Sequence, residues 1–166
     1  RGVGPTENIY HVPGTGDPEG VIPDKVFRPG EEEEFLRDLD FLVVGLPLNQ
    51  STEGLIGERE LQLLPPRAFV LNPARGPIIK ESALIQALEE KWIAGAALDT
   101  HYHYPMPPEH PLWKLPNVIF TPHISGSSLS PNFTVRLWDI FSRNLERFTN
   151  AEPLLNELTA GQLSGK

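Results

Sequence analysis

Four short apolar runs constrain the fold of this 166-residue chain more than any other feature of its sequence. The first run, residues 41–46, is apolar throughout and is followed at once by Pro47. A continuous run of this length is typical of a strand that is buried on both faces, as in a parallel sheet. The other three runs occupy residues 68–71, 94–98 and 118–120. We therefore predict four strands of one buried sheet.

Segments with helical spacing lie between and after these runs. Helices are expected at 57–64 and 81–92, and a short helix is expected to begin at 29–30, where Glu31–Glu34 place negative charge in its first turn. A longer amphipathic helix follows the last strand, with an apolar stripe of Phe133, Leu137, Ile140, Phe141, Leu145 and Phe148. Strands that alternate with helices imply right-handed crossovers. The predicted fold is therefore α/β, an open parallel sheet with helices on both faces.

Composition narrows the classes of protein to which the chain can belong. Its formal net charge of −8 argues against nucleic acid as a partner, because the phosphates would be repelled. No stretch approaches the roughly 18 consecutive apolar residues of a membrane span, and no signal peptide is visible. The chain has no cysteine, which fits the reducing cytoplasm, where we expect the protein to be located.

Two ionisable side chains follow two of the predicted strands. Arg75 lies in the segment 72–76, Asn-Pro-Ala-Arg-Gly, and His123 lies in the segment 121–126, Thr-Pro-His-Ile-Ser-Gly. The carboxyl ends of parallel strands lie at one edge of a sheet, where open α/β sheets bind their ligands. An arginine binds a carboxylate and polarises a carbonyl, and a histidine transfers a proton near neutral pH. This pair therefore predicts redox or acyl chemistry on a small acid.

Several further motifs occur in the order and spacing of one known family. They are Asp40–Leu48, Ser51–Ile56, Leu71–Pro77, Ala94–Asp99, Pro111–Trp113 and Pro116–Gly126. Over residues 35–158 the chain resembles the C-terminal part of the NAD-binding domain of the D-isomer-specific 2-hydroxyacid dehydrogenases, which reduce 2-keto acids with NAD(P)H. The resemblance implies a Rossmann-like sheet that is incomplete, being the second half of a dinucleotide-binding domain. It also implies NAD or NADP as cofactor, a small 2-keto or 2-hydroxy acid as substrate, and a homodimer.

The resemblance assigns a role to each matched position. Arg75 would bind the substrate carboxylate and polarise the keto oxygen, and His123 would donate a proton as hydride arrives from the nicotinamide. Both would stabilise the negative charge that develops on the keto oxygen. Asp99 would hold the nicotinamide amide. The implied cofactor-binding positions are Leu46, Pro47, Thr52, Pro73, Ala74, Arg75, Asp99, His123, Ser125 and Gly126.

Position 104 departs from the family. Its members usually carry a glutamate five residues after the aspartate, paired with the catalytic histidine, whereas this chain has Tyr104. A tyrosine can orient an imidazole by a hydrogen bond but supplies no charge. Glu109 is the nearest carboxylate in sequence, but it aligns better with the turn before Pro111 and is the less favoured substitute.

His101 and His103 have a spacing that occurs among metal ligands. No third ligand follows at an obvious spacing, and tyrosine and proline are interleaved with the two histidines. We therefore favour a structured loop over the edge of the site, and we expect no metal.

The family's Gly-rich pyrophosphate loop and its substrate domain are both missing from this sequence. We therefore expect a fragment of a longer enzyme, inactive alone, or else a natural half-protein that relies on a partner. Its predicted parts are a loop-rich segment at 1–30, which allows a short strand at 8–12, a partial NAD(P)-binding domain at 31–158, and a tail at 159–166. The alternative function is a non-catalytic module that senses dinucleotide or binds a protein, and Tyr104 motivates it.

Overall fold

The computed structural model describes residues 8–17, 19–126, 128 and 130–161, and these form two compact units. One unit lies within residues 27–126 and contains the sheet. The other combines the described residues of 1–26 and 127–162. The domain predicted at 31–158 includes residues of both units.

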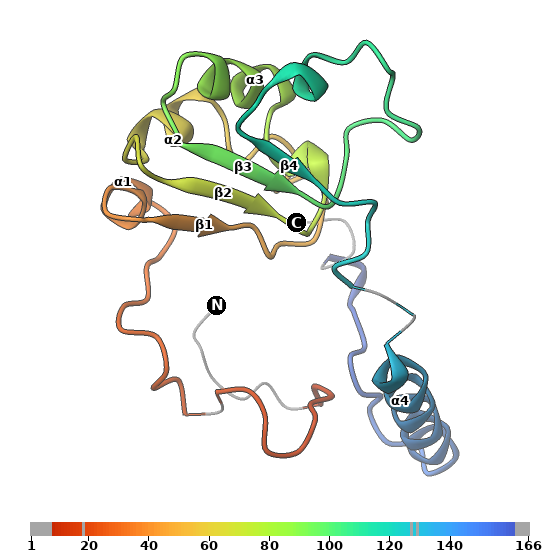
Figure 1. Cartoon of the computed structure of the whole chain (residues 1–166). Coiled ribbons are helices and arrows are strands. Elements are labelled where there is room, and N and C mark those ends of the chain that lie inside the picture. The colour runs from red at the N-terminus through yellow and green to blue at the C-terminus, as the bar shows by residue number, and fades with distance from the viewer. Residues whose placement is uncertain (1–7, 18, 127, 129, 162–166) are drawn as a thin grey trace. The chain divides into compact units, whose positions relative to one another are not determined.

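The sheet has four parallel strands in the order β1-β2-β3-β4 (Figure 1). They are β1 Phe41–Val43, β2 Phe69–Asn72, β3 Gly95–Leu98 and β4 Val118–Phe120. The four predicted strands and the Rossmann-like parallel arrangement are confirmed. β1 is shorter than its apolar run: the N–H of Val44 still donates to Leu71 over 2.9 Å, but Pro47 has no N–H to continue the pairing.

Short helices connect these strands. They are α1 Glu32–Leu36, α2 Glu58–Leu63 and α3 Glu81–Glu89, with 3₁₀ turns at Gly76–Ile78 (η1) and Pro111–Lys114 (η2). The N–H of Gly57 donates to the Glu60 carboxylate over 2.9 Å, which fixes the start of α2. The three predicted helices are confirmed, although α3 ends at Glu89. The two 3₁₀ turns were not predicted.

The helices α2 and α3 cover one face of the sheet (Figure 1). A single buried core contains Leu42, Val70 and Leu98 of the sheet together with Leu61 of α2 and Leu84 of α3. The opposite face carries large exposed side chains, which are Phe41 (61%), Val43 (60%) and Ile119 (68%). Among the described residues of this unit, no helix covers that second face. The continuous apolar runs had predicted burial on both faces.

The other unit contains α4, Pro131–Thr149. Its first turn is capped by the Ser130 hydroxyl, which accepts the N–H of Asn132. No residue of α4 is buried, and its large apolar side chains other than Ile140 are 44–72% exposed. The residues of the buried core include none from α4.

The N-terminal part of this unit has no strand at 8–12, although the sequence allowed one there. The N–H of Tyr10 donates to the side chain of Asn156 over 2.9 Å instead of pairing with a strand. Of the tail predicted at 159–166, residues 162–166 lie outside the described part of the chain. No helix that the structure describes is long and apolar enough to span a bilayer.

Gly76 marks a close approach between the loop after β2 and the loop after β3. A Cβ atom at this position would lie 2.7 Å from the carbonyl carbon and oxygen of His101. These are backbone atoms, which cannot rotate away, so only glycine allows the two loops to approach this closely. Because Arg75 precedes Gly76, the contact also fixes the loop that carries the predicted substrate-binding side chain.

Gly76→Ala is expected to lower the free energy of unfolding by about 1–3 kcal/mol, as over-packing does in well-packed interiors. Gly45→Ala is the matched control, because no atom lies within 4 Å of a Cβ built at Gly45. Urea denaturation followed by circular dichroism measures both variants. Equal midpoints for the two would contradict the close contact.

Candidate active site

Three strand ends place the predicted site residues at one edge of the sheet. Asn72, Leu98 and Phe120 are register neighbours on β2, β3 and β4. The segment with Arg75 follows the first of these strands, Asp99 follows the second, and the segment with His123 follows the third. Because the strands are parallel, all three segments leave the sheet at its carboxyl edge.

The Arg75 loop is held by the buried side chain of Asn72, which is 1% exposed. Its Nδ2 donates to the carbonyl of Arg75 over 2.9 Å, and its Oδ1 accepts the N–H of Ala74 over 3.1 Å. The guanidinium of Arg75 remains exposed, with one bond from Nη1 to the Ala74 carbonyl at 2.6 Å. Sequence reasoning gave Asn72 no role. The available signal was an Asn at a strand end, where this side chain often bonds to the backbone two residues on.

The His123 loop is held by Asp99, which is 6% exposed. Oδ1 accepts the Thr121 hydroxyl and the N–H of Ile124, the latter over 2.9 Å. Oδ2 accepts the hydroxyl and the N–H of Ser125, the latter also over 2.9 Å. The carboxylate thus binds residues on both sides of His123 and positions that loop. The resemblance had implied only a contact with the nicotinamide for Asp99.

These four hydrogen bonds also decide the charge of Asp99. Burial by itself would raise the pKa of this carboxyl. The hydroxyls of Ser125 and Thr121 and the N–H groups of Ile124 and Ser125 outweigh burial and hold the pKa far below its usual range. Asp99 is therefore a fixed negative charge at the centre of the edge.

His123 itself has an unusual backbone conformation, with φ at +58°. Side-chain-bearing residues rarely occupy this left-handed region, although histidine does so more often than most. The bonds from Asp99 to Thr121, Ile124 and Ser125 on either side hold the backbone there. The imidazole is exposed, and its Nδ1 lies 3.3 Å from the hydroxyl of Tyr104.

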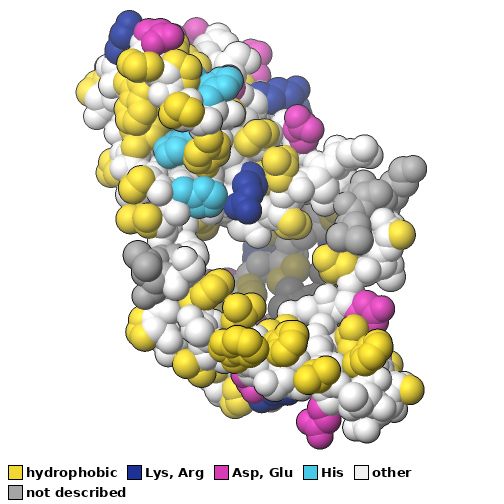
Figure 2. Space-filling view, turned by 90° about the vertical axis from the view of Figure 1, so that its right-hand side faces the viewer, with side chains coloured by type: hydrophobic (Ala, Val, Ile, Leu, Met, Phe, Trp, Pro, Cys, Tyr) yellow, Lys and Arg dark blue, Asp and Glu magenta, His cyan; other side chains and the backbone are white. Residues whose placement is uncertain are grey.

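Position 104 therefore lies next to His123, as the alignment with the family implied. Glu109 is exposed, and within the described residues no hydrogen bond or ion pair joins it to His123. His101 also lies at this edge: its Nε2 is 3.1 Å from the Thr121 carbonyl, and its ring packs against those of Tyr104 and Phe120. Figure 2 shows histidine side chains gathered on one face of the molecule, beside a basic side chain.

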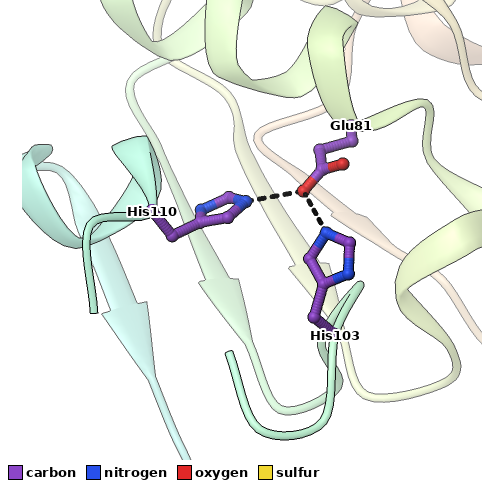
Figure 3. A group of neighbouring side chains, drawn as sticks. All are labelled: Glu81, His103 and His110. Atoms are coloured by element: carbon purple, nitrogen blue, oxygen red, sulfur yellow. Dashed lines mark hydrogen bonds and ion pairs between the residues drawn. The ribbon is translucent and has the colours of Figure 1, made fainter. Parts of the chain in front are cut away.

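His103 has different partners from His101. The ligand atoms of Glu81, His103 and His110 all lie within 4.8 Å of one another, and the two rings converge on one carboxylate oxygen (Figure 3). That oxygen is 2.6 Å from Nε2 of His110 and 3.6 Å from Nε2 of His103. His101 and His103 thus bond different groups: His101 the Thr121 carbonyl and His103 the Glu81 carboxylate.

The hydrogen bonds of His110 indicate that its bond to Glu81 links η2 to α3, and that this group is not arranged to bind a metal ion. The N–H of Leu112 donates to Nδ1 of His110 over 3.3 Å. Nδ1 then carries a lone pair, so a neutral His110 has its proton on Nε2 and donates it to Glu81. A metal ion at Nε2 would displace that proton and require Nδ1 to give up the Leu112 bond.

Two grooves follow the carboxyl edge and contain most of the predicted cofactor positions. The larger, about 640 Å³, is lined by Leu46, Pro47, Pro73, Ala74 and Arg75 among others. The smaller, about 150 Å³, is lined by residues that include Pro73, Asp99 and Thr121. The walls of both grooves are largely apolar.

The remaining predicted positions behave differently. The Thr52 hydroxyl donates to the Pro47 carbonyl over 2.6 Å and accepts the Asn49 N–H, so it shapes the loop that carries Pro47. The Ser125 hydroxyl is bonded to Asp99. No atom lies within 4 Å of a Cβ built at Gly126, so this position leaves open space beside the site. The sequence has no G-x-G-x-x-G turn to bind a pyrophosphate, so only part of a dinucleotide fits the residues present.

Comparison with known proteins gives consistent matches. A glyoxylate reductase of Thermofilum pendens is 38% identical over 136 residues, covering 82% of this chain and 39% of that protein. A glyoxylate reductase of Thermococcus gammatolerans is 42% identical over 120 residues, covering 72% of this chain and 35% of that protein. The chain thus spans well under half the length of these curated relatives.

The structure of a D-isomer specific 2-hydroxyacid dehydrogenase from Xanthobacter autotrophicus Py2, solved with NADPH and MES, superimposes with a TM-score of 0.71 at 37% identity. The match covers 79% of this chain and 52% of that one. Residues 8–125 also match the family described as D-isomer specific 2-hydroxyacid dehydrogenase, NAD binding domain. The chain belongs to the D-isomer specific 2-hydroxyacid dehydrogenase family, and the part of that family it represents is the NAD-binding domain.

Proposed function

We propose that this chain is the second half of the NAD-binding domain of an NAD(P)-dependent 2-hydroxyacid dehydrogenase, and that the whole enzyme interconverts a small 2-keto acid and its 2-hydroxy acid. The observation that carries the proposal is the arrangement of the carboxyl edge. Arg75 lines the larger groove, His123 follows two residues after Thr121 of the smaller one, and Asn72 and Asp99 fix the loops that carry them. The family's glyoxylate reductases and the NADPH-bound relative support this assignment.

The uncovered face of the sheet supports the view that the active protein is larger. Phe41, Val43 and Ile119 are more than half exposed there, although strands with continuous apolar runs are normally buried on both sides. A further layer of the same enzyme would cover this face. The backbone that binds the pyrophosphate would come from the same additional part.

Two side chains have separate roles in the proposed reaction. When bound, the reduced nicotinamide supplies the hydride for the keto carbon. The Arg75 guanidinium binds the substrate carboxylate and polarises the keto oxygen, where negative charge develops. The His123 imidazolium donates a proton to that oxygen and completes the hydroxyl group.

The direct test uses the full-length protein with a panel of 2-keto acids that includes glyoxylate, hydroxypyruvate and pyruvate. We expect oxidation of NADH or NADPH, followed at 340 nm, with at least one of them. Absence of turnover with every acid and both cofactors would reject the proposal. The rival function, a dinucleotide sensor with Tyr104 in place of the acid, then predicts calorimetric binding of NAD(P)H without turnover.

Substitutions of the two side chains should separate binding from chemistry. Arg75→Lys keeps a positive charge but loses the planar fork, so we expect a higher KM for the keto acid together with a lower kcat, and a loss in kcat/KM of about 100-fold. His123→Asn should lower kcat by about 10²- to 10⁴-fold with little change in KM, because it removes the proton donor. Asparagine is chosen because it tolerates a positive φ. A purely structural role would instead give similar, small losses for both variants.

Asp99→Asn tests the fixed charge of the edge through the dependence of stability on pH. The folded state depresses the pKa of Asp99, so its contribution to stability is present above the usual pKa of about 4 and is lost as the pH falls below it. The variant should be less stable at pH 7, by about 1.5–3 kcal/mol, and this difference should shrink below about pH 4.

Denaturant titrations at several pH values measure this effect. The control is Asp40→Asn, since Asp40 is 64% exposed in its ion pair with Arg67 and exposed pairs contribute about 1 kcal/mol or less. A difference between Asp99→Asn and the wild type that stays constant down to about pH 2 would contradict the assigned charge.

We also propose that the enzyme is a homodimer, as the resemblance implies. The exposed apolar side chains of α4 support this proposal, because a surface of this kind is usually covered in a working protein. A monomer mass for the full-length enzyme in sedimentation velocity would rule the dimer out.

A further inference from the structure

The hydroxyl of Tyr104 lies between two groups of the candidate site. It accepts the backbone N–H of His101 over 3.0 Å. The same oxygen is 3.3 Å from Nδ1 of His123, and the Tyr104 and His123 ring centroids are 5.9 Å apart. Tyr104 therefore contacts the imidazole that the proposed reaction uses.

The partner on the other side leaves the hydroxyl proton of Tyr104 available for the bond to His123. A backbone N–H can only donate, so the His101 contact occupies a lone pair of the Tyr104 oxygen. The hydroxyl proton is then free to point at Nδ1. An imidazole whose Nδ1 accepts a hydrogen bond has its proton on Nε2 when it is neutral.

We propose that Tyr104 is the positioning residue for His123: it replaces the family's carboxylate, orients the imidazole, and holds the neutral ring in the tautomer with the proton on Nε2. This inference rests on the proposed function for its catalytic meaning, but the geometry stands without it. Nε2 is the nitrogen turned away from the contact with Tyr104, so the imidazolium gives its Nε2 proton to the keto oxygen. The ring left behind carries its proton on Nδ1 and donates it to the Tyr104 oxygen until the ring returns to the resting tautomer.

A hydroxyl differs from a carboxylate in a way that suits this position. A carboxylate only accepts, so it would place the proton of a neutral ring on Nδ1. A hydroxyl donates to the neutral ring, and after rotation about its C–O bond it accepts the Nδ1–H of the protonated ring. Tyr104 thus holds one ring orientation in both protonation states and adds no charge.

The tautomer is measured directly by ¹⁵N NMR of the full-length protein labelled at histidine, at a pH where the ring is neutral. The His123 signals are identified by their loss in His123→Asn. In the wild type we expect the proton on Nε2. In Tyr104→Phe we expect a mixture of tautomers, and in Tyr104→Glu we expect the proton on Nδ1.

Kinetics supply the second measurement. Tyr104→Phe should lower kcat about five- to tenfold, the effect of one hydrogen bond, and change KM for the keto acid less than the error of the assay. Tyr102→Phe is the matched control, because the buried Tyr102 hydroxyl has no hydrogen-bond partner among the described residues. It should leave both the tautomer and kcat unchanged.

Two results would overturn the proposal. One is a wild-type His123 with its proton on Nδ1, and the other is a Tyr104→Phe protein whose tautomer equals that of the wild type. Because the NMR readout does not require turnover, it decides the role of Tyr104 even if no keto acid is reduced. Failure of the proposed function is registered separately, by the substrate panel.

Discussion

The candidate site depends on the hydrogen bonds that Asp99 makes. This residue sits at the end of β3, the strand between those that lead to Arg75 and His123. Its N–H bonds the carbonyl of Asn72 over 3.2 Å, and its side chain accepts four hydrogen bonds from residues 121–125. Asp99 thus joins the end of β2 through its backbone and the His123 loop through its carboxylate, and the left-handed backbone of His123 persists because the bonds on both sides of it are made.

The strands could be predicted because a buried strand is a run of consecutive apolar residues, which is visible in the sequence. Each apolar run corresponds to one strand, and the ends of the runs located the edge at which Arg75, Asp99 and His123 would meet. The helix α3 was predictable for the same reason, since its buried residues Leu84, Ala87 and Leu88 repeat at helical spacing. The exposure of the apolar side chains of α4 was not predictable, because an apolar stripe indicates that a face is covered without naming the surface that covers it.

The connections within the site could not be predicted from local pattern. Asp99 bonds residues 22 to 26 positions away, and the hydroxyl of Tyr104 bonds a ring 19 positions away. Nothing in the spacing of His101 and His103 indicates that one ring turns to Thr121 while the other turns to Glu81. Such bonds depend on where the sheet register places strand ends, so they become visible only when the fold is known.

The two faces of the sheet differ in how far their side chains are buried. Covered by α2 and α3, one face has the burial expected of a folded core, with Val70 and Leu84 both fully enclosed. The other carries equally apolar residues and remains exposed, at a cost of about 25 cal/mol for each Å² of apolar surface left in water. On the proposal that the whole enzyme is larger, these residues are adapted to a covering layer. On the same proposal that part would also supply the pyrophosphate contacts, so this unit would depend on one neighbour for both its stability and its chemistry.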